Sequence, residues 1–219
     1  MIKLGKRLET LASFVDKDTI IADVGADHGK LIIYLAEKGI IAKGYGIENK
    51  LGPFQILAYN LRSAHSACLS AVLQDGISQL ANDVDTIILA GLGGETIISI
   101  LKEGRANLKN VQTIITDSHT SLGDVRKYIV TLGYIIKDEK LILERNKYYE
   151  ITKFVKTDKP VIYTDFEYQR GPIIIQSPEF KQFAKKAIAK LDTLLKKDLP
   201  DPIKKAMIAE KEVFKTYED

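Results

Sequence analysis

The feature that most constrains the fold of this 219-residue chain is the order of its apolar segments. Short runs rich in Ile, Val and Thr alternate with longer segments whose apolar residues recur at helical spacing. The strand-like runs lie at residues 19–23, 43–48, 68–73, 85–90 and 113–117, and the helical patterns lie at 29–39, 53–64, 94–103 and 121–132. This alternation predicts an α/β fold in which a mainly parallel sheet carries helices on both faces.

The alternation stops near residue 133. Two strand-like runs, 134–143 and 148–155, follow each other with only residues 144–147 between them. A gap of that length suits a hairpin and is too short for a crossover helix. We therefore expect a mainly parallel, seven-stranded sheet that ends in an antiparallel hairpin at its edge.

The C-terminal part has a different pattern. Residues 156–172 form a connector that contains Pro160, Gly171 and Pro172. Apolar residues then recur at helical spacing over 180–195 and 203–217, on either side of a proline-containing break at 198–202. These two stripes predict a helical hairpin, whose helices either pack on each other as a short antiparallel coiled coil or dock on the main domain. We place the domain boundary between residues 1–158 and 159–219.

Composition excludes several classes of protein. The chain has 32 Lys+Arg against 29 Asp+Glu, a net charge of +3, and 45% hydrophobic residues, which excludes a polybasic tail and a highly charged disordered chain. The balance neither requires nor excludes a nucleic-acid partner, because only local patches decide that.

Cysteine usage and hydropathy bear on the compartment. The single cysteine, Cys68, excludes an intrachain disulfide framework and a cysteine-rich zinc site, so we expect no metal. A lone thiol fits a reducing compartment. The N-terminus does not resemble a secretory signal, and no apolar run approaches the roughly 18 residues that a membrane helix needs. We expect a cytoplasmic protein that does not bind a membrane.

The loop after the first strand carries the first chemical signal. In an open parallel sheet, ligands bind beyond the carboxyl ends of the strands. Gly25 allows a tight turn there, and Asp23 and Asp27 flank it. These acids would repel a pyrophosphate and attract an amine or a sulfonium. The dinucleotide-binding fingerprint also fails, because its second glycine position holds Asp27.

Three more loops of this kind follow, each at the end of a predicted strand. Glu48 ends the second strand, where an acid can accept both hydroxyls of a ribose or simply be a solvated charge. Asp75 and Gly76 follow the third strand, as an acceptor for an adenine amino group or as an ordinary turn. The fourth loop, 90–94, has three glycines, so either a group approaches this backbone closely or the turn needs positive φ. Together the four loops predict a negatively charged cofactor pocket.

Several segments resemble the bacterial tRNA (adenine-22-N1)-methyltransferase family, class I enzymes that use S-adenosyl-L-methionine. The resemblance runs from about Leu4 to the C-terminal helices, and Arg126 fits the same layout. The segments that carry it are Asp-Val-Gly-Ala-Asp-His at 23–28, Gly-Pro-Phe at 52–54, Ile-Leu-Ala-Gly-Leu-Gly-Gly at 88–94, Tyr-Glu-Ile at 149–151 and Gly-Pro at 171–172.

This resemblance implies a Rossmann-like methyltransferase domain that moves the methyl group of S-adenosyl-L-methionine to N1 of adenine 22 in tRNA. The residues it assigns to the cofactor are Asp23, Gly25 and Asp27 for the methionine part with His28 beside them, Glu48 for the ribose, Asp75 and Gly76 for the adenine, and Ala90 and Gly91 near the sulfonium.

The chain departs from the family in two places. The family typically has Gln-Pro-Asn where this chain has Asp117, Ser118 and His119. In related enzymes that place faces the target base, and His119 could compensate by hydrogen bonding or stacking. Lys30 stands where an aromatic residue is usual, and could meet a tRNA phosphate.

Asp27 and His28 are our first candidates for the polar groups nearest the target adenine, followed by His119 and Asp117. The alternative for His28 is a loop residue that caps the next helix. Rival functions are methylation of another base or a small molecule, an NAD-dependent oxidoreductase, and a binding module without chemistry. The lysines of the C-terminal helices form either a solvated face or an RNA contact. We expect a monomer, because the two apolar stripes can cover each other.

Overall fold

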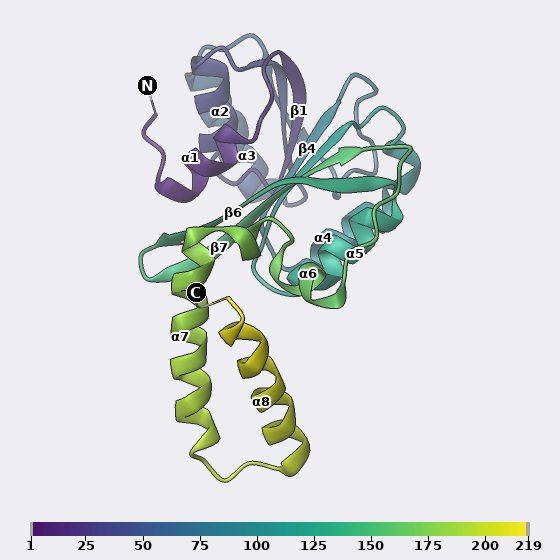
Figure 1. Ribbon diagram of the computed structural model, residues 1–219. Coiled ribbons are helices and arrows are strands. Elements are labelled where there is room, and N and C mark those ends of the chain that lie inside the picture. The colour runs from purple at the N-terminus through teal and green to yellow at the C-terminus, as the bar shows by residue number, and fades with distance from the viewer. Residues whose placement is uncertain (1, 218–219) are drawn as a thin grey trace.

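The computed structural model describes residues 2–217 and contains one seven-stranded sheet, in the order β3-β2-β1-β4-β5-β7-β6 (Figure 1). Strands β1 to β5 are parallel, and β7 runs antiparallel to both β5 and β6. The predicted sheet with its antiparallel edge pair is therefore confirmed. The strands are β1 (Thr19–Val24), β2 (Ile41–Glu48), β3 (Leu69–Leu73), β4 (Thr86–Leu92), β5 (Thr113–Ser118), β6 (Tyr134–Glu144) and β7 (Lys147–Lys156).

Helices cover both faces of the sheet, and each face has its own apolar core. Alternate side chains of a strand point to opposite faces, so Ile88 joins a core with α1, α2 and α3, whereas Ile87 and Leu89 join one with α4 and α5. The helices are α1 (Lys6–Ser13), α2 (Lys30–Glu37), α3 (Leu51–Ser63), α4 (Gly94–Glu103) and α5 (Leu122–Thr131), with a 3₁₀ turn η1 (Arg105–Asn107) after α4.

The hairpin between β6 and β7 is tighter than expected. Its strands extend to Glu144 and Lys147, so only Arg145 and Asn146 form the turn. Both residues have positive φ, 47° and 64°, as the two-residue turn of a twisted hairpin requires. The predicted four-residue gap therefore includes one residue from each strand.

The connector contains a helix that the sequence prediction missed. Helix α6 (Asp165–Arg170) begins with a capping box, in which Thr164 Oγ1 accepts from the Glu167 N–H and the Glu167 carboxylate accepts from the Thr164 N–H. The Thr-x-x-Glu spacing is a recognised helix-start signal. A 3₁₀ turn, η2 (Ile174–Gln176), follows the connector.

Helices α7 (Pro178–Leu195) and α8 (Asp201–Lys215) form the predicted hairpin, which extends away from the sheet (Figure 1). Phe180 and Leu191 of α7 and Phe214 of α8 are buried in one cluster that also includes Leu141 of β6. The helices thus pack on each other, and their base docks on the edge of the sheet. The division at residue 158 stays a prediction. Within residues 2–217, no helix has the length and apolar composition to cross a membrane.

Buried charges attach the connector to the sheet. The Arg126 side chain is 2% exposed. It donates from Nε to Glu139 and from Nη2 to Glu150, each at a distance of 2.8 Å, and its Nη1 donates to the Tyr168 carbonyl. Glu139 also accepts from the Ile173 N–H at 3.0 Å. Gly171 has a φ of +83°, and a Cβ there would lie 2.5 Å from Glu139 Oε2, which these hydrogen bonds hold in place, so this position favours glycine.

Candidate active site

The four loops singled out from the sequence lie at one edge of the sheet. They follow β3, β2, β1 and β4, which are neighbours in that order, and they leave from the carboxyl ends of parallel strands. The chain order reverses between β1 and β4, and ligands of open α/β sheets bind at such a switch point.

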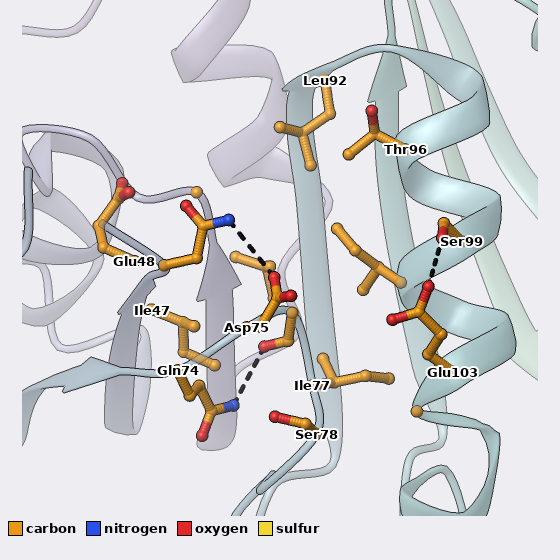
Figure 2. A pocket seen from close by; sticks show the side chains of 16 residues that line it. Ile47, Glu48, Gln74, Asp75, Ile77, Ser78, Leu92, Thr96, Ser99 and Glu103 are labelled. Atoms are coloured by element: carbon orange, nitrogen blue, oxygen red, sulfur yellow. Dashed lines mark hydrogen bonds between the residues drawn. The ribbon is translucent and has the colours of Figure 1, made fainter.

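One cavity of about 290 Å³ lies beside β1, between the ends of β2 and β4 and helix α4 (Figure 2). Glu48 and Asp75 supply carboxylates, and Ile77 and Leu92 supply apolar walls. The Asn49 side-chain amide donates to Asp75 at 3.3 Å and fixes that carboxylate. An apolar slot edged by acids suits a flat ring with amino and hydroxyl donors.

A second cavity, of about 350 Å³, meets the first at Gly25, whose φ is +75°. It is more polar than the first, and both β1 and β4 contribute to it. The residues that line it include Arg7, Asp23, Asp27, His28, Ala90, Gly91 and His119. The structure therefore brings the predicted site residues together in two adjoining spaces.

Glu48 connects the end of β2 to the loop that follows β1. Its Oε1 accepts from the backbone N–H of Asp27 at 2.6 Å, and Asp27 has a positive φ of 51°. An L-residue avoids that conformation unless its surroundings hold it there. Glu48 is thus a loop support as well as the predicted ribose acceptor.

Asp23 is the buried acid of the second cavity. It is 5% exposed. Burial raises its pKa from 3.8 to about 7, Glu48 adds to the rise, and Arg7 opposes it. A cation bound next to this carboxyl would favour its charged form.

Asp27 and His28 lie at the mouth of the second cavity. Their side chains are 80% and 51% exposed, and Asp27 Oδ1 lies 3.6 Å from His28 Nε2. The Asn60 amide donates to the His28 carbonyl at 3.0 Å and holds this loop against α3. His28 does not cap α2, because Gly29 is the N-cap and no side chain accepts from the helix there.

Arg7 is the site residue that the sequence prediction missed. It comes from α1, and its Nε pairs with Asp117, which is fully buried. Burial raises the pKa of the Asp117 carboxyl, although Arg7 opposes the rise. No motif marks Arg7, so only the fold could show that α1 reaches this cavity.

Arg7 and His119 line the second cavity together with Asp27, and Tyr149 packs against both of them. Arg7 Cζ lies 5.4 Å from the centre of the Tyr149 ring, and the His119 ring meets that ring edge-on at 6.2 Å. Burial and Lys147 lower the pKa of His119, while Asp117 opposes them. A neutral imidazole therefore prevails there at neutral pH, able to donate or accept a hydrogen bond.

A family model for a methyltransferase domain matches residues 4–152. The chain therefore belongs to the methyltransferase-domain family, the class that the sheet order and the adjoining cavities also define.

More specific relatives confirm the resemblance to the bacterial tRNA (adenine-22-N1)-methyltransferases. The Bacillus subtilis tRNA (adenine(22)-N(1))-methyltransferase is 26% identical over 175 residues, 79% of this chain and 74% of that protein. A Streptococcus pneumoniae protein in complex with S-adenosyl-L-methionine has a TM-score of 0.88 at 29% identity, covering 99% of this chain and 100% of that one. An uncharacterized Listeria monocytogenes protein reaches 0.93 at 26% identity, with 99% and 100% covered.

Proposed function

We propose that this protein uses S-adenosyl-L-methionine to methylate N1 of adenine 22 in tRNA. One observation carries the proposal: two cavities adjoin at Gly25 on the switch point, one shaped for a nucleoside and the other lined by acids, two imidazoles and a guanidinium. The Bacillus subtilis and Streptococcus pneumoniae relatives support the substrate and the cofactor.

The residues present fit this cofactor. Glu48 and Asp75 in the first cavity would take the ribose hydroxyls and the adenine amino group, and Gly76 also lines that cavity. In the second cavity, Asp23 would face the amine and sulfonium, with Gly25, Asp27 and His28 around the methionine part and Ala90 and Gly91 beneath the reacting end. A buried carboxyl such as Asp23 becomes charged most easily beside a cation.

When bound, S-adenosyl-L-methionine supplies a methyl group activated by its sulfonium. The protein's own task is then positioning, which can lower a barrier by roughly 7–11 kcal/mol. Adenine N1 is a neutral nucleophile, so no residue has to remove a proton before attack. Asp27, His28 and His119 would contact the base, and the carboxylates nearby stabilise the positive charge that the methylated ring acquires. N1 lies on the pairing edge, so the base must leave its helix to be held here.

The tRNA surface is proposed to include the C-terminal hairpin. Lys186 and Lys190 of α7 are exposed and line a cleft of about 420 Å³ between α7 and α8. Lys186 Nζ lies 5.3 Å from the Tyr148 ring at the tip of the β6–β7 hairpin. Reversing both charges (Lys186→Glu with Lys190→Glu) should weaken tRNA binding at fixed salt and leave cofactor binding unchanged.

Assembly and location complete the proposal. A monomer is supported by the burial of Phe180 and Phe214 within the hairpin, which leaves less apolar surface for a second copy. A reaction on tRNA and a single partly exposed thiol support the cytoplasm.

The decisive experiment incubates the protein with S-adenosyl-L-methionine and unmodified tRNA, followed by digestion and mass spectrometry. We expect 1-methyladenosine at position 22, and none in a tRNA carrying guanosine there. Methylation only at another position would overturn the substrate assignment. NAD that bound more tightly than S-adenosyl-L-methionine in calorimetry would support the oxidoreductase instead, and activity that survived Asp23→Ala with Asp27→Ala would overturn the cofactor assignment.

A further inference from the structure

Arg7 holds its guanidinium in an unusual position for a surface-helix residue. The side chain crosses from α1 to the end of β5, where Nε pairs with Asp117, and its backbone N–H donates to Glu144 Oε1 at 3.3 Å. The Tyr149 ring lies at its side, with the Cζ-to-centroid distance 5.4 Å. Contacts on these sides leave the guanidinium little freedom, so its remaining donors have a fixed direction.

Within the described part of the chain, no residue accepts from those remaining donors. Among residues 2–217, the bond from Nε to Asp117 is the only side-chain hydrogen bond that Arg7 makes. Arg7 lines the second cavity, and a Cβ built on Gly91 would lie 2.9 Å from Arg7 Nη2 and 3.9 Å from His119 Nε2. Arg7 Nη2 therefore lies close to Gly91, the residue assigned to the reacting end of the cofactor, where the target base must also arrive.

Asp117 matters here for its charge. Its side chain is 0% exposed, Oδ1 has no hydrogen-bond partner among residues 2–217, and the ion pair with Arg7 compensates its charge. An isolated guanidinium would disfavour a cationic methyladenine beside it, whereas a guanidinium paired with a carboxylate adds no net charge. The pair can thus offer hydrogen-bond donors to the base without opposing the charge that develops on it.

We propose that Arg7, held by Asp117 and Tyr149, orients the target adenine by donating from its Nη groups to a ring nitrogen other than N1. Adenine has two such acceptors, N7 on its Hoogsteen edge and N3 on its minor-groove edge. A donor at either one leaves N1 free to face the methyl group. This proposal rests on the proposed tRNA adenine substrate.

The test combines Arg7→Gln with tRNAs that carry 7-deazaadenosine or 3-deazaadenosine at position 22. Each analogue lacks one acceptor and changes the reactivity of N1 equally for both enzymes, so comparing the losses isolates the contact. With one analogue we expect the wild type to lose about tenfold in kcat/KM and Arg7→Gln to lose less than about threefold. Equal losses in the two enzymes for both analogues would overturn the proposal.

Two controls distinguish orientation from folding. Thermal melting and S-adenosyl-L-methionine binding report whether Arg7→Gln is folded. If that single variant does not fold, the double variant Arg7→Gln with Asp117→Asn replaces the ion pair with a neutral hydrogen-bonded pair. Full recovery of kcat/KM in the double variant would show that Arg7 only ties α1 to β5. A wild type that leaves adenosine 22 unmethylated would instead overturn the proposed function, so the two failures are distinguishable.

Discussion

The carboxylate of Glu48, the last residue of β2, accepts a hydrogen bond at 2.6 Å from the backbone N–H of Asp27 in the loop after β1. One acid therefore shapes the loop after β1 and also lines the cavity proposed for the nucleoside. These two roles can be separated by mutation.

Glu48→Gln keeps an oxygen that can accept the Asp27 N–H and removes the charged acceptor for the ribose. We expect it to weaken S-adenosyl-L-methionine binding by about 10- to 100-fold, because a hydrogen bond to a charged group contributes roughly 1.5–3 kcal/mol. The melting temperature should hardly change. Glu48→Ala removes both roles and should weaken binding further, and calorimetry measures both variants. Equal binding by Glu48→Gln and wild type would exclude the ribose role.

Asp23 should make cofactor binding depend on pH. Its pKa in the free protein is about 7, and a neighbouring cation lowers it, so binding near neutral pH should release a proton. Affinity should then fall as pH drops below 7. Calorimetry in buffers with different ionisation enthalpies measures the release, and Asp23→Asn should abolish it. A wild type that releases no proton at pH 7 would contradict this assignment.

The same carboxyl should affect the stability of the free protein. Because the folded pKa of about 7 lies above the ordinary value of 3.8, its contribution is most favourable below pH 3.8 and is lost as pH rises through about 7. Asp23→Asn should therefore show a smaller fall in unfolding free energy between about pH 4 and pH 7 than wild type. Urea denaturation across this range measures the difference, and parallel pH profiles would contradict it.

Gly91 and Gly39 form a matched pair for separating backbone strain from crowding. Both have positive φ, +76° and +61°. A Cβ at Gly91 would lie 2.9 Å from Arg7 Nη2, whereas a Cβ at Gly39 would have no atom of the described residues within 4 Å, its chain neighbours aside. Alanine at either position should cost about 1–2 kcal/mol of unfolding free energy through strain. Only Gly91→Ala should also displace Arg7 and reduce kcat for methyl transfer. Equal activity of the two variants would show that the contact with Arg7 is unimportant.

Arg126→Met should be strongly destabilising, because it leaves Glu139 and Glu150 buried without a cation. We expect a loss of about 3–5 kcal/mol in urea denaturation. The loss should shrink at acid pH, since uncompensated buried carboxyls have raised pKa values and protonate there. Lys127→Met is the control, because Lys127 and Asp165 pair at the surface, with 45% and 90% exposure, and such pairs contribute about 0–1 kcal/mol. Equal losses in the two variants would contradict a buried charge network.

The fold was predictable where the local sequence pattern and the burial in the tertiary structure favour the same element. Strand β5 shows this, because residues 113–117 combine β-branched side chains with complete burial in the sheet. Helix α6 was missed because its six residues are too short for a periodic pattern, although Thr164 and Glu167 mark its start. The hairpin turn was overestimated because Arg145 and Asn146 adopt positive φ without a glycine.

The site residues were predictable only where they lie at the carboxyl ends of the parallel strands. Asp23, Glu48 and Asp75 are placed by a general rule of parallel sheets, which the sequence reveals. Arg7 belongs to a helix outside the alternation, and its reach depends on how α1 packs against the β6–β7 hairpin. Asp117 was a candidate for a group that contacts the target adenine, whereas its side chain is fully buried and paired with Arg7.

Glu139 has a mechanical consequence for the C-terminal hairpin. This one carboxylate accepts from Arg126 of α5, Thr152 of β7 and the Ile173 N–H at the entrance to α7, and Gly171 lies directly against it. A joint tied to three elements cannot act as a free hinge. Helices α7 and α8 should therefore move with the sheet as one rigid unit. A force on their far end, such as the binding of a large substrate there, would be transmitted to β6 and β7 and would not be taken up by bending in the connector.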